Sequence, residues 1–233
     1  MSSDAILELF GQTLVLMPEH AIFWAEARTL LVADTHWGKA ATFRAAGLAV
    51  PGGTTAEGLN RLDFAIDRTG AERVVFLGDF LHAPEGRVEG TMAALAAWRG
   101  TRPDLDLLLV RGNHDKRAGD PPEECRIVCA NPLVTDGPFG FAHFPGGKPG
   151  VYVISGHLHP AIRLSGKGMQ RARLPCFWVR PDHLVMPAFG DFTGKADVRP
   201  HAGDRLFAVG GGSVVEIADT VVRKPPRRGL FKR

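Results

Sequence analysis

The amino-acid sequence predicts an α/β sandwich that forms one large domain. In the first half, short apolar runs alternate with segments of helical periodicity, which is typical of β-strands joined by α-helices. After residue 116, short apolar runs separated by Gly-Pro turns dominate and indicate a second set of strands. Candidate functional residues come from both halves. We therefore expect one domain over residues 1–221 and a basic tail over residues 222–233.

The first half contains the clearest helix. Residues 54–69 repeat apolar side chains at the helical period, and Gly70 stands where a helix C-cap is expected. Shorter helices are predicted over residues 39–46, ending at Gly47, and 88–98, ending at Gly100. The expected strands are 13–17, 21–24, 30–33, 73–77 and 105–110, and the first two form a hairpin interrupted at Pro18.

The second half is predicted to consist mainly of strands. Turn residues such as Gly137-Pro138 separate the apolar runs and mark the connections between them. The expected strands are 126–129, 133–135, 140–143, 151–155, 161–164, 171–179, 183–186, 206–209 and 214–217.

Composition narrows the class of protein. The 233 residues are 45% hydrophobic and 23% charged, as in an ordinary soluble globular protein. No apolar run approaches the length of a membrane span, and the first twelve residues do not resemble a secretion signal, so we expect a cytoplasmic protein that is not bound to a membrane. Three cysteines do not form a disulfide scaffold.

The net charge of +3 is distributed unevenly. The six cationic residues of the tail leave a net charge of −3 on residues 1–221. Such a tail could contact the phosphates of nucleic acid, or it could be a disordered, solubilising end. The tail cations are Arg223, Lys224, Arg227, Arg228, Lys232 and Arg233.

Four short polar strings each follow an apolar run. They are residues 34–36 (Asp-Thr-His), 78–82 (Gly-Asp-Phe-Leu-His), 112–115 (Gly-Asn-His-Asp) and 156–159 (Gly-His-Leu-His). Strands that end in Asp, Asn or His present metal ligands at the edge of a sheet, where four tips can meet. A glycine opens three of the strings and permits a tight backbone path close to an ion or a phosphate.

These strings offer oxygen and nitrogen ligands and no thiolate, which suits manganese, iron or zinc. Asp79 is the natural bridge, because each of its oxygens can hold one ion. Two ions ~3.5–4 Å apart clamp a phosphate group and activate a water molecule. In residues 34–36 and 157–159 the ligands stand at i and i+2, so on an extended strand they would point the same way, and beyond the strand tip the chain can splay them onto different ions. The candidate ligands are Asp34, His36, Asp79, Asn113, His143, His157 and His159.

In this order, the strings resemble the motifs of the calcineurin-like metallophosphoesterases, from about Thr13 to Ile217. The resemblance implies a fold of two mixed β-sheets flanked by helices, with two divalent ions at one sheet edge. Asp34, His36, Asp79 and His159 would hold one ion, and Asp79, Asn113, His143 and His157 would hold the other. His114 would protonate or stabilise the leaving oxygen, and Asp115 would orient His114.

Further residues resemble a bacterial subgroup, the ligase-associated DNA damage response endonucleases (PdeM). This likeness implies a metal-dependent nuclease or phosphodiesterase acting on DNA in repair, with ligase, helicase or exonuclease partners. We expect manganese as the metal, with iron or zinc as alternatives. The residues that carry it are 33–39 (Ala-Asp-Thr-His-Trp-Gly-Lys), Phe43-Arg44, Val50-Pro51, 78–82, 111–115 and 187–190 (Pro-Ala-Phe-Gly).

The roles of several further residues allow two interpretations. Lys39 and Arg44 could bind substrate phosphates or form a solvated surface. His82 could reach substrate or support another histidine by a hydrogen bond. Trp37 could stack on a base or cover the metal edge. We interpret His20, His183 and His201 as surface or turn residues, and Asp191 as a turn aspartate.

Three functions remain open at this point. The leading hypothesis is hydrolysis of DNA phosphodiester bonds by an endonuclease with a dinuclear metal centre. The second is a small-molecule phosphatase or nucleotide pyrophosphatase that uses the same metal centre. The third is a non-catalytic scaffold that keeps the metals and binds a repair partner.

Overall fold

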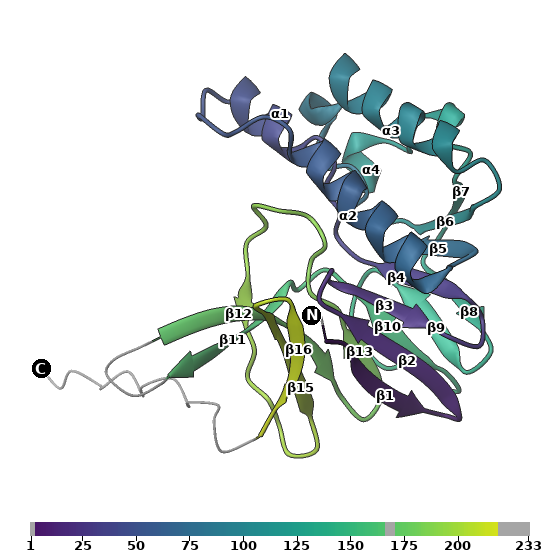
Figure 1. Cartoon of the computed structure of the whole chain (residues 1–233), viewed down its shortest axis with the longest axis vertical. Coiled ribbons are helices and arrows are strands. Elements are labelled where there is room, and N and C mark those ends of the chain that lie inside the picture. The colour runs from purple at the N-terminus through teal and green to yellow at the C-terminus, as the bar shows by residue number, and fades with distance from the viewer. Residues whose placement is uncertain (1–2, 166–170, 219–233) are drawn as a thin grey trace, which may run out of the picture.

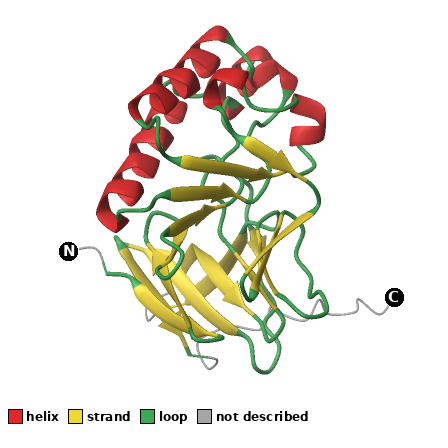
Figure 2. Ribbon diagram, turned by 90° about the vertical axis from the view of Figure 1, so that its right-hand side faces the viewer, coloured by secondary structure: helices red, strands yellow, loops and turns green. Residues whose placement is uncertain are grey.

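The protein is a sandwich of two β-sheets with helices over one outer face, as its computed structural model shows (Figures 1 and 2). The structure describes residues 3–165 and 171–218. In Figure 2 the helices (red) lie at the top of the molecule and the strands (yellow) lie below them. This arrangement confirms the predicted fold class of two mixed sheets flanked by helices.

The first sheet changes from antiparallel to parallel at its centre. The strands from β1 to β4 form an antiparallel meander, and the strands from β4 to β7 run parallel. Its strands, in spatial order, are β1 (Ala5–Leu9), β2 (Gln12–Met17), β3 (Ala21–Trp24), β4 (Thr29–Val32), β5 (Arg73–Phe76), β6 (Asp106–Val110) and β7 (Val128–Ala130). The parallel half requires crossover connections, which the helices provide.

Helix α2 has the predicted bounds, and Gly70 ends it in the left-handed conformation. Helix α3 continues through Gly100, so the predicted end at that glycine is wrong: the glycine costs helix stability without stopping the helix. The helices are α1 (Lys39–Ala45), α2 (Thr54–Thr69), α3 (Glu89–Thr101) and α4 (Asp115–Ala118), with short 3₁₀ turns η1 (Pro84–Gly86) and η2 (Glu123–Cys125).

The second sheet contains the remaining strands. Strands β9, β10 and β13 run parallel at its centre, and β11 and β12 form a long antiparallel hairpin that extends from the body in Figure 1. Its strands are β8 (Leu133–Asp136), β9 (Phe139–Ala142), β10 (Tyr152–Ser155), β11 (Pro160–Ser165), β12 (Arg171–Val179), β13 (His183–Val185), β14 (Ala196–Asp197), β15 (Arg205–Gly210) and β16 (Ser213–Ile217).

Alternating side chains of the parallel strands enter two different cores. On β4, Leu31 packs between the sheets, whereas Leu30 and Val32 pack against the helices. On β5, Val75 packs between the sheets and Val74 packs against the helices. Burial on both faces explains why these strands are continuous apolar runs, and each fully buried Leu or Val contributes roughly 1.5–3 kcal/mol.

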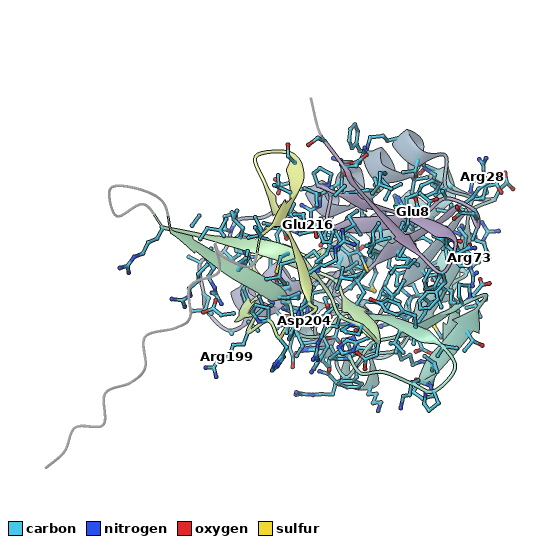
Figure 3. All side chains as sticks on the ribbon, turned by 90° about the horizontal axis from the view of Figure 1, so that it is seen from below. Glu8, Arg28, Arg73, Arg199, Asp204 and Glu216 are labelled. Carbon is cyan, nitrogen blue, oxygen red and sulfur yellow. The ribbon has the colours of Figure 1, made fainter. Side chains whose placement is uncertain are left out.

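Ion pairs join the edges of the sandwich. Arg73 of β5 lies 2.7 Å from Asp136 of β8, so this pair links the two sheets. Arg205 and Glu216 pair across the β15–β16 hairpin at 2.6 Å. Figure 3 shows Arg73 and Glu216 among the labelled charged side chains, with Arg28 and Arg199 on opposite sides of this view.

The division into a domain and a tail stays a prediction. Both sheets contribute side chains to the apolar core between them, which includes Leu31 and Phe177. The tail over residues 222–233 lies outside the described residues. Within the described ranges 3–165 and 171–218, no helix has the length and apolar character needed to cross a membrane.

Candidate metal centre

The four polar strings meet at one edge of the sandwich, beyond the carboxyl ends of β4, β5, β6 and β10. The Asp34 and His36 amides donate to the carbonyls of Gly78 and Asp79, at 3.2 and 2.9 Å. The His157 amide donates to Asp34 Oδ2 at 2.8 Å. Strings far apart in the sequence are therefore side by side, because parallel strands place their carboxyl ends at the same edge.

The backbone of most predicted ligands is left-handed. Asp34, His36, Asp79, His157 and His159 have φ between 48° and 71°. Non-glycine residues rarely adopt this conformation, and each instance costs of order 1–3 kcal/mol. Ligands at i and i+2 therefore do not point together as they would on an extended strand, and the chain splays His157 and His159 into different ligand groups, as expected beyond a strand tip. The strands have already ended, and left-handed turns aim the side chains.

The glycines of the strings make room for ligands of other strings. A Cβ added to Gly78 would overlap His143, and one added to Gly112 would overlap Asp79. A Cβ at Gly156 would overlap the Asp34 carboxylate. The glycines thus allow the backbone to approach ligand side chains of other strings closely.

A first ligand group comprises Asp34, His36 and His159. Their ligand atoms lie within 4.8 Å of one another, and His159 Nε2 is 3.5 Å from Asp34 Oδ1. The His159 ring is held by its Nδ1, which donates to the Gly194 carbonyl at 2.9 Å. Among the described residues, neither Asp34 Oδ1 nor His159 Nε2 has a hydrogen-bond partner, although both atoms are buried.

A second ligand group comprises Asp79, Asn113, His143 and His157. The ligand atoms of Asp79, His143 and His157 lie within 4.8 Å of one another. His143 Nε2 is 3.0 Å from Asn113 Oδ1 and 3.1 Å from His157 Nδ1. The other nitrogen of His143, Nδ1, is 3.0 Å from the Leu77 carbonyl, which fixes the ring and leaves Nε2 directed at the group.

Asp79 stands between the two groups. Its Oδ2 lies 3.8 Å from His36 Nε2, and its Oδ1 lies 3.4 Å from His143 Nε2. The His114 amide donates to Oδ1 at 2.9 Å. One carboxylate oxygen thus faces each group, as a bridging ligand requires.

The residues present fit divalent cations. Asp34 and Asp79 are 0% and 2% exposed, and within the described ranges no Lys or Arg lies within 4.0 Å of either carboxylate. A buried carboxylate without a cation is costly. Burial also lowers the pKa of the His36 and His157 imidazoles, which favours the neutral form that binds metals. The oxygen and nitrogen donors suit manganese, iron or zinc alike.

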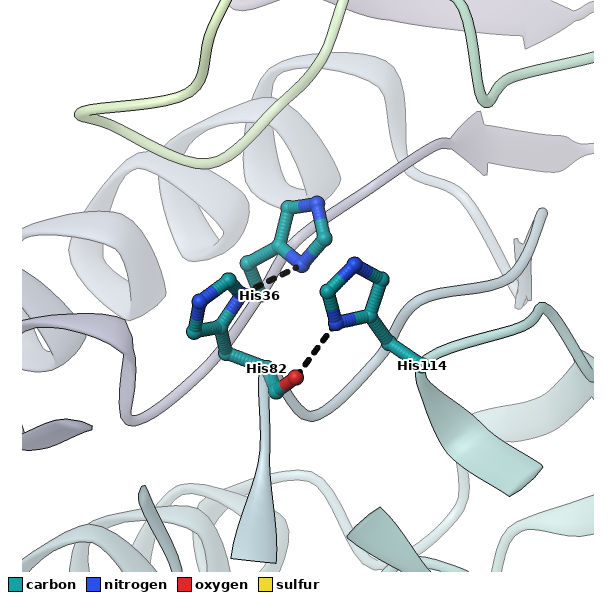
Figure 4. A group of neighbouring side chains, drawn as sticks. All are labelled: His36, His82 and His114. Carbon is teal, nitrogen blue, oxygen red and sulfur yellow. Dashed lines mark hydrogen bonds between the residues drawn. The ribbon is translucent and has the colours of Figure 1, made fainter. Parts of the chain in front are cut away.

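Three further histidine contacts surround this centre (Figure 4). His114 Nδ1 is 2.5 Å from the His82 carbonyl oxygen. The rings of His82 and His114 stack, with centroids 4.9 Å apart. His82 Nδ1 lies 3.2 Å from His36 Nδ1. His82 therefore supports two neighbouring histidines, which is the second of its two predicted interpretations.

Asp115 does not hold the His114 ring. Its carboxylate accepts hydrogen bonds from the backbone amides of Asp79, Phe80 and Gly112 at 2.7–2.8 Å, and a longer one from Leu81 at 3.4 Å. The predicted orienting contact is thus wrong, because the His82 carbonyl fills that role. Asp115 instead joins the strings that follow β5 and β6.

The two residues predicted to bind substrate phosphates, Lys39 and Arg44, differ in their surroundings. Lys39 is half-buried and borders a small cavity with His36; burial lowers the pKa of its ammonium group, against the opposing effect of Asp34 and Asp79. Arg44 donates to the carbonyls of Val50 and Pro51 at 3.5 and 3.3 Å, so it braces the segment between α1 and α2.

Trp37 is 3% exposed and packs its ring against Phe80 and Phe189, so it covers the metal edge and cannot stack on a base. The interpretation of His183 as a surface or turn residue is also wrong, because it is a buried residue of β13. Asp191 lies in a turn as predicted, and it pairs with Arg61 at 3.2 Å.

Two exposed phenylalanines near the ligands were not expected from the sequence. Phe144 packs against the rings of His143 and His157, with centroids 4.8 and 4.7 Å away. Phe192 borders two cavities that also contain His36 or His159 in their walls. Their only signal in the sequence is a position directly after a polar residue at a strand end, which is too common to be diagnostic.

Comparison with solved structures gives a strong relationship to a nuclease. A crystal structure of the nuclease MPE from Pseudomonas putida matches with a TM-score of 0.81 and 37% identity, covering 92% of this chain and 100% of that chain. The E. coli phosphoesterase YfcE matches at a TM-score of 0.41 and 12% identity, covering 82% and 98%, a likeness too distant to carry an argument. No protein-family model and no curated protein matches.

The identity to the Pseudomonas nuclease extends over nearly the whole chain, and the ordered strings meet as the resemblance implied. Both observations lead to the same assignment. The chain belongs to the calcineurin-like metallophosphoesterases, and it is a hydrolase of phosphoester bonds.

Proposed function

We propose that this protein is a manganese-dependent endonuclease that hydrolyses phosphodiester bonds in DNA during repair, with two metal ions at the candidate centre. The observation that carries this proposal is the pair of ligand groups on either side of Asp79, with His114 beside them and outside both groups. The relative with 37% identity is a nuclease, which supports a phosphodiester substrate.

In this proposal Asp34, His36 and His159 hold one ion, Asn113, His143 and His157 hold the other, and Asp79 is shared. Divalent ions at such a centre polarise the phosphate and lower the pKa of a bound water. The chain contributes a prearranged set of ligands, because hydrogen bonds to the carbonyls of Leu77 and Gly194 already fix His143 and His159.

His114 is the proposed proton donor to the leaving oxygen. Because its Nδ1 is held by the His82 carbonyl, its Nε2 is the nitrogen left to face the centre, 3.9 Å from Asp79 Oδ2. The side chain is 32% exposed, so a substrate can reach it. Alkoxide leaving groups of a nucleic acid need such a proton, and general acids of this kind contribute typically 10²–10⁴-fold.

Lys39 is the proposed phosphate contact. Its ammonium group is close enough to the centre for Asp34 and Asp79 to affect its pKa, and a cation placed there would attract a phosphate anion. Resemblance to the repair subgroup supports repair partners such as a ligase, helicase or exonuclease. The basic tail at 222–233 would add nonspecific attraction to DNA.

The decisive experiment combines metal analysis with a substrate panel. We expect about two manganese ions per chain, turnover of bis-p-nitrophenyl phosphate, and cleavage of single-stranded or nicked DNA. Asp79→Asn should strongly reduce all three, while the control His201→Ala, at an exposed histidine outside both groups, should leave them unchanged. Hydrolysis of a phosphomonoester without cleavage of either diester would contradict the proposal and favour the small-molecule phosphatase.

A further inference from the structure

A cavity of about 230 Å³ opens beside the first ligand group. His159 forms part of its wall, together with His20, Asp191, Phe192 and Lys195. A single water molecule needs only about 10–15 Å³ of such volume, so this space exceeds what water at the centre requires. The cavity lies between the loop that follows β13 and the start of β11.

Phe192 is the unusual residue of this wall. It is 54% exposed, and its φ of 57° is left-handed, which is a rare conformation for a bulky side chain. Phe10 shares both features, with 62% exposure and a φ of 54°. Phe10, however, belongs to the tight turn between β1 and β2, where a positive φ is required, and its ring contacts Tyr152. Phe192 also lies in a turn, but its exposed ring borders the cavity, whereas the ring of Phe10 packs on Tyr152.

The polar members of the wall complement a nucleoside. Lys195 is exposed and offers a cation. His20 Nδ1 is 2.8 Å from the Ala188 carbonyl, and burial lowers the pKa of its ring. The neutral ring therefore donates from Nδ1 and keeps Nε2 as an acceptor for an N–H or O–H group. Asp191 is already paired with Arg61, so it adds little repulsion.

The position of His114 indicates whether this cavity receives the leaving group of the substrate or the part that keeps the phosphate. His114 borders neither the large cavity nor the smaller one beside Lys39. His36 contacts both histidines, with ring centroids 4.9 Å from His114 and 5.5 Å from His159. The leaving oxygen departs towards His114, so the cavity at His159 adjoins the part of the substrate that keeps the phosphate.

We propose that this cavity binds the nucleoside that stays attached to the scissile phosphate, and that its base stacks on Phe192. The inference rests on the proposed phosphodiesterase function and assigns a specificity-determining residue to it. Stacking of a base on an aromatic side chain is sequence-tolerant, because every base presents a flat face.

Two substrates that differ only in this group provide the test. Thymidine 5′-(p-nitrophenyl phosphate) and methyl p-nitrophenyl phosphate share a leaving group, and only the first carries a nucleoside. Phe192→Gly, which relieves the strained φ, should raise KM roughly tenfold for the thymidine ester and leave the methyl ester unchanged. Phe192→Trp should restore the wild-type KM. Phe10→Gly is the matched control and should change neither value.

A binding measurement separates this inference from the proposed function. The manganese-loaded wild type should bind thymidine 5′-monophosphate roughly tenfold more tightly than methyl phosphate, and Phe192→Gly should remove the difference. Equal binding of both phosphates by the wild type, or an equal change in both on substitution, would overturn the subsite. Absence of diester turnover with retained selective binding would overturn the phosphodiesterase function alone.

Discussion

The two ligand groups differ in how well their polar atoms are satisfied without a metal ion. In the second group, His143 Nε2 is within 3.1 Å of both Asn113 Oδ1 and His157 Nδ1. In the first group, Asp34 Oδ1 and His159 Nε2 are buried without a hydrogen-bond partner among the described residues. Because an unsatisfied buried polar atom costs about 1–3 kcal/mol, the first group depends more strongly on a cation.

The surroundings of the groups differ as well. Both cavities described above border the first group, one through His36 and the other through His159. The second group is instead covered in part by the exposed ring of Phe144. One side of the centre therefore has space for a bulky organic group, while an apolar ring screens the other.

Asp79→Asn is expected to have the largest effect, because Asp79 faces both groups. Loss of several kcal/mol of charge stabilisation should lower kcat/KM for bis-p-nitrophenyl phosphate about a thousandfold. Elemental analysis should show less manganese at both positions. Asp63→Asn is the control, since Asp63 pairs with Arg102 away from the centre. Retention of two ions with native affinity by Asp79→Asn would break the idea of a shared carboxylate.

His114→Ala should separate reaction chemistry from metal binding. Because His114 belongs to neither group, manganese content should remain native. Cleavage of DNA should fall about 10²–10⁴-fold, whereas a nitrophenyl ester, whose leaving group needs no proton, should lose far less. Gel assays of DNA and absorbance assays of the ester measure the two rates. An equal loss on both substrates would show that His114 does not act on the leaving oxygen.

The metal ligands were predictable because their information is local. Each string follows an apolar strand, and parallel strands must bring their carboxyl ends together. The left-handed φ of Asp34 and His159 was not predictable, because Asp and His, unlike glycine, do not indicate that conformation in a sequence. The ligands were thus identified while the way in which the chain aims them was not.

The features that the sequence did not predict have either a weak local pattern or a cause in long-range contacts. Strands β1 and β14 were not predicted, because β1 has the exposed residues Ile6 and Glu8 and β14 has only two residues. The contact of Asp115 with the Asp79 and Phe80 amides joins positions more than thirty residues apart, which no spacing rule reveals. Phe192 acquires its place beside His159 in the same way.

Asp34→Asn should sharpen the contrast between the groups in the metal-free protein. The substitution removes a buried carboxylate charge but keeps an acceptor for the His157 amide, and Asn tolerates the left-handed backbone. The melting temperature of the metal-free variant should therefore rise by about 2–4 °C. Asn113→Ala should lower it, because His143 loses a partner. Calorimetry of both variants measures the shifts, and a lower melting temperature for metal-free Asp34→Asn would contradict the comparison.

The smallest effect is expected on the cavity side, at His20. Burial lowers the pKa of His20 in the folded protein, whereas the unfolded chain binds a proton near pH 6.5. As the pH falls below about 6.5, protonation therefore favours the unfolded state, and stability is lost. His20→Asn, which suits the left-handed φ of 64°, should reduce the fall in melting temperature between about pH 7.5 and about pH 5.5 in the metal-free protein. His201→Asn, at an exposed position, should leave that fall as in the wild type. An equal change in both variants would show that His20 is not a neutral, half-buried member of the cavity wall.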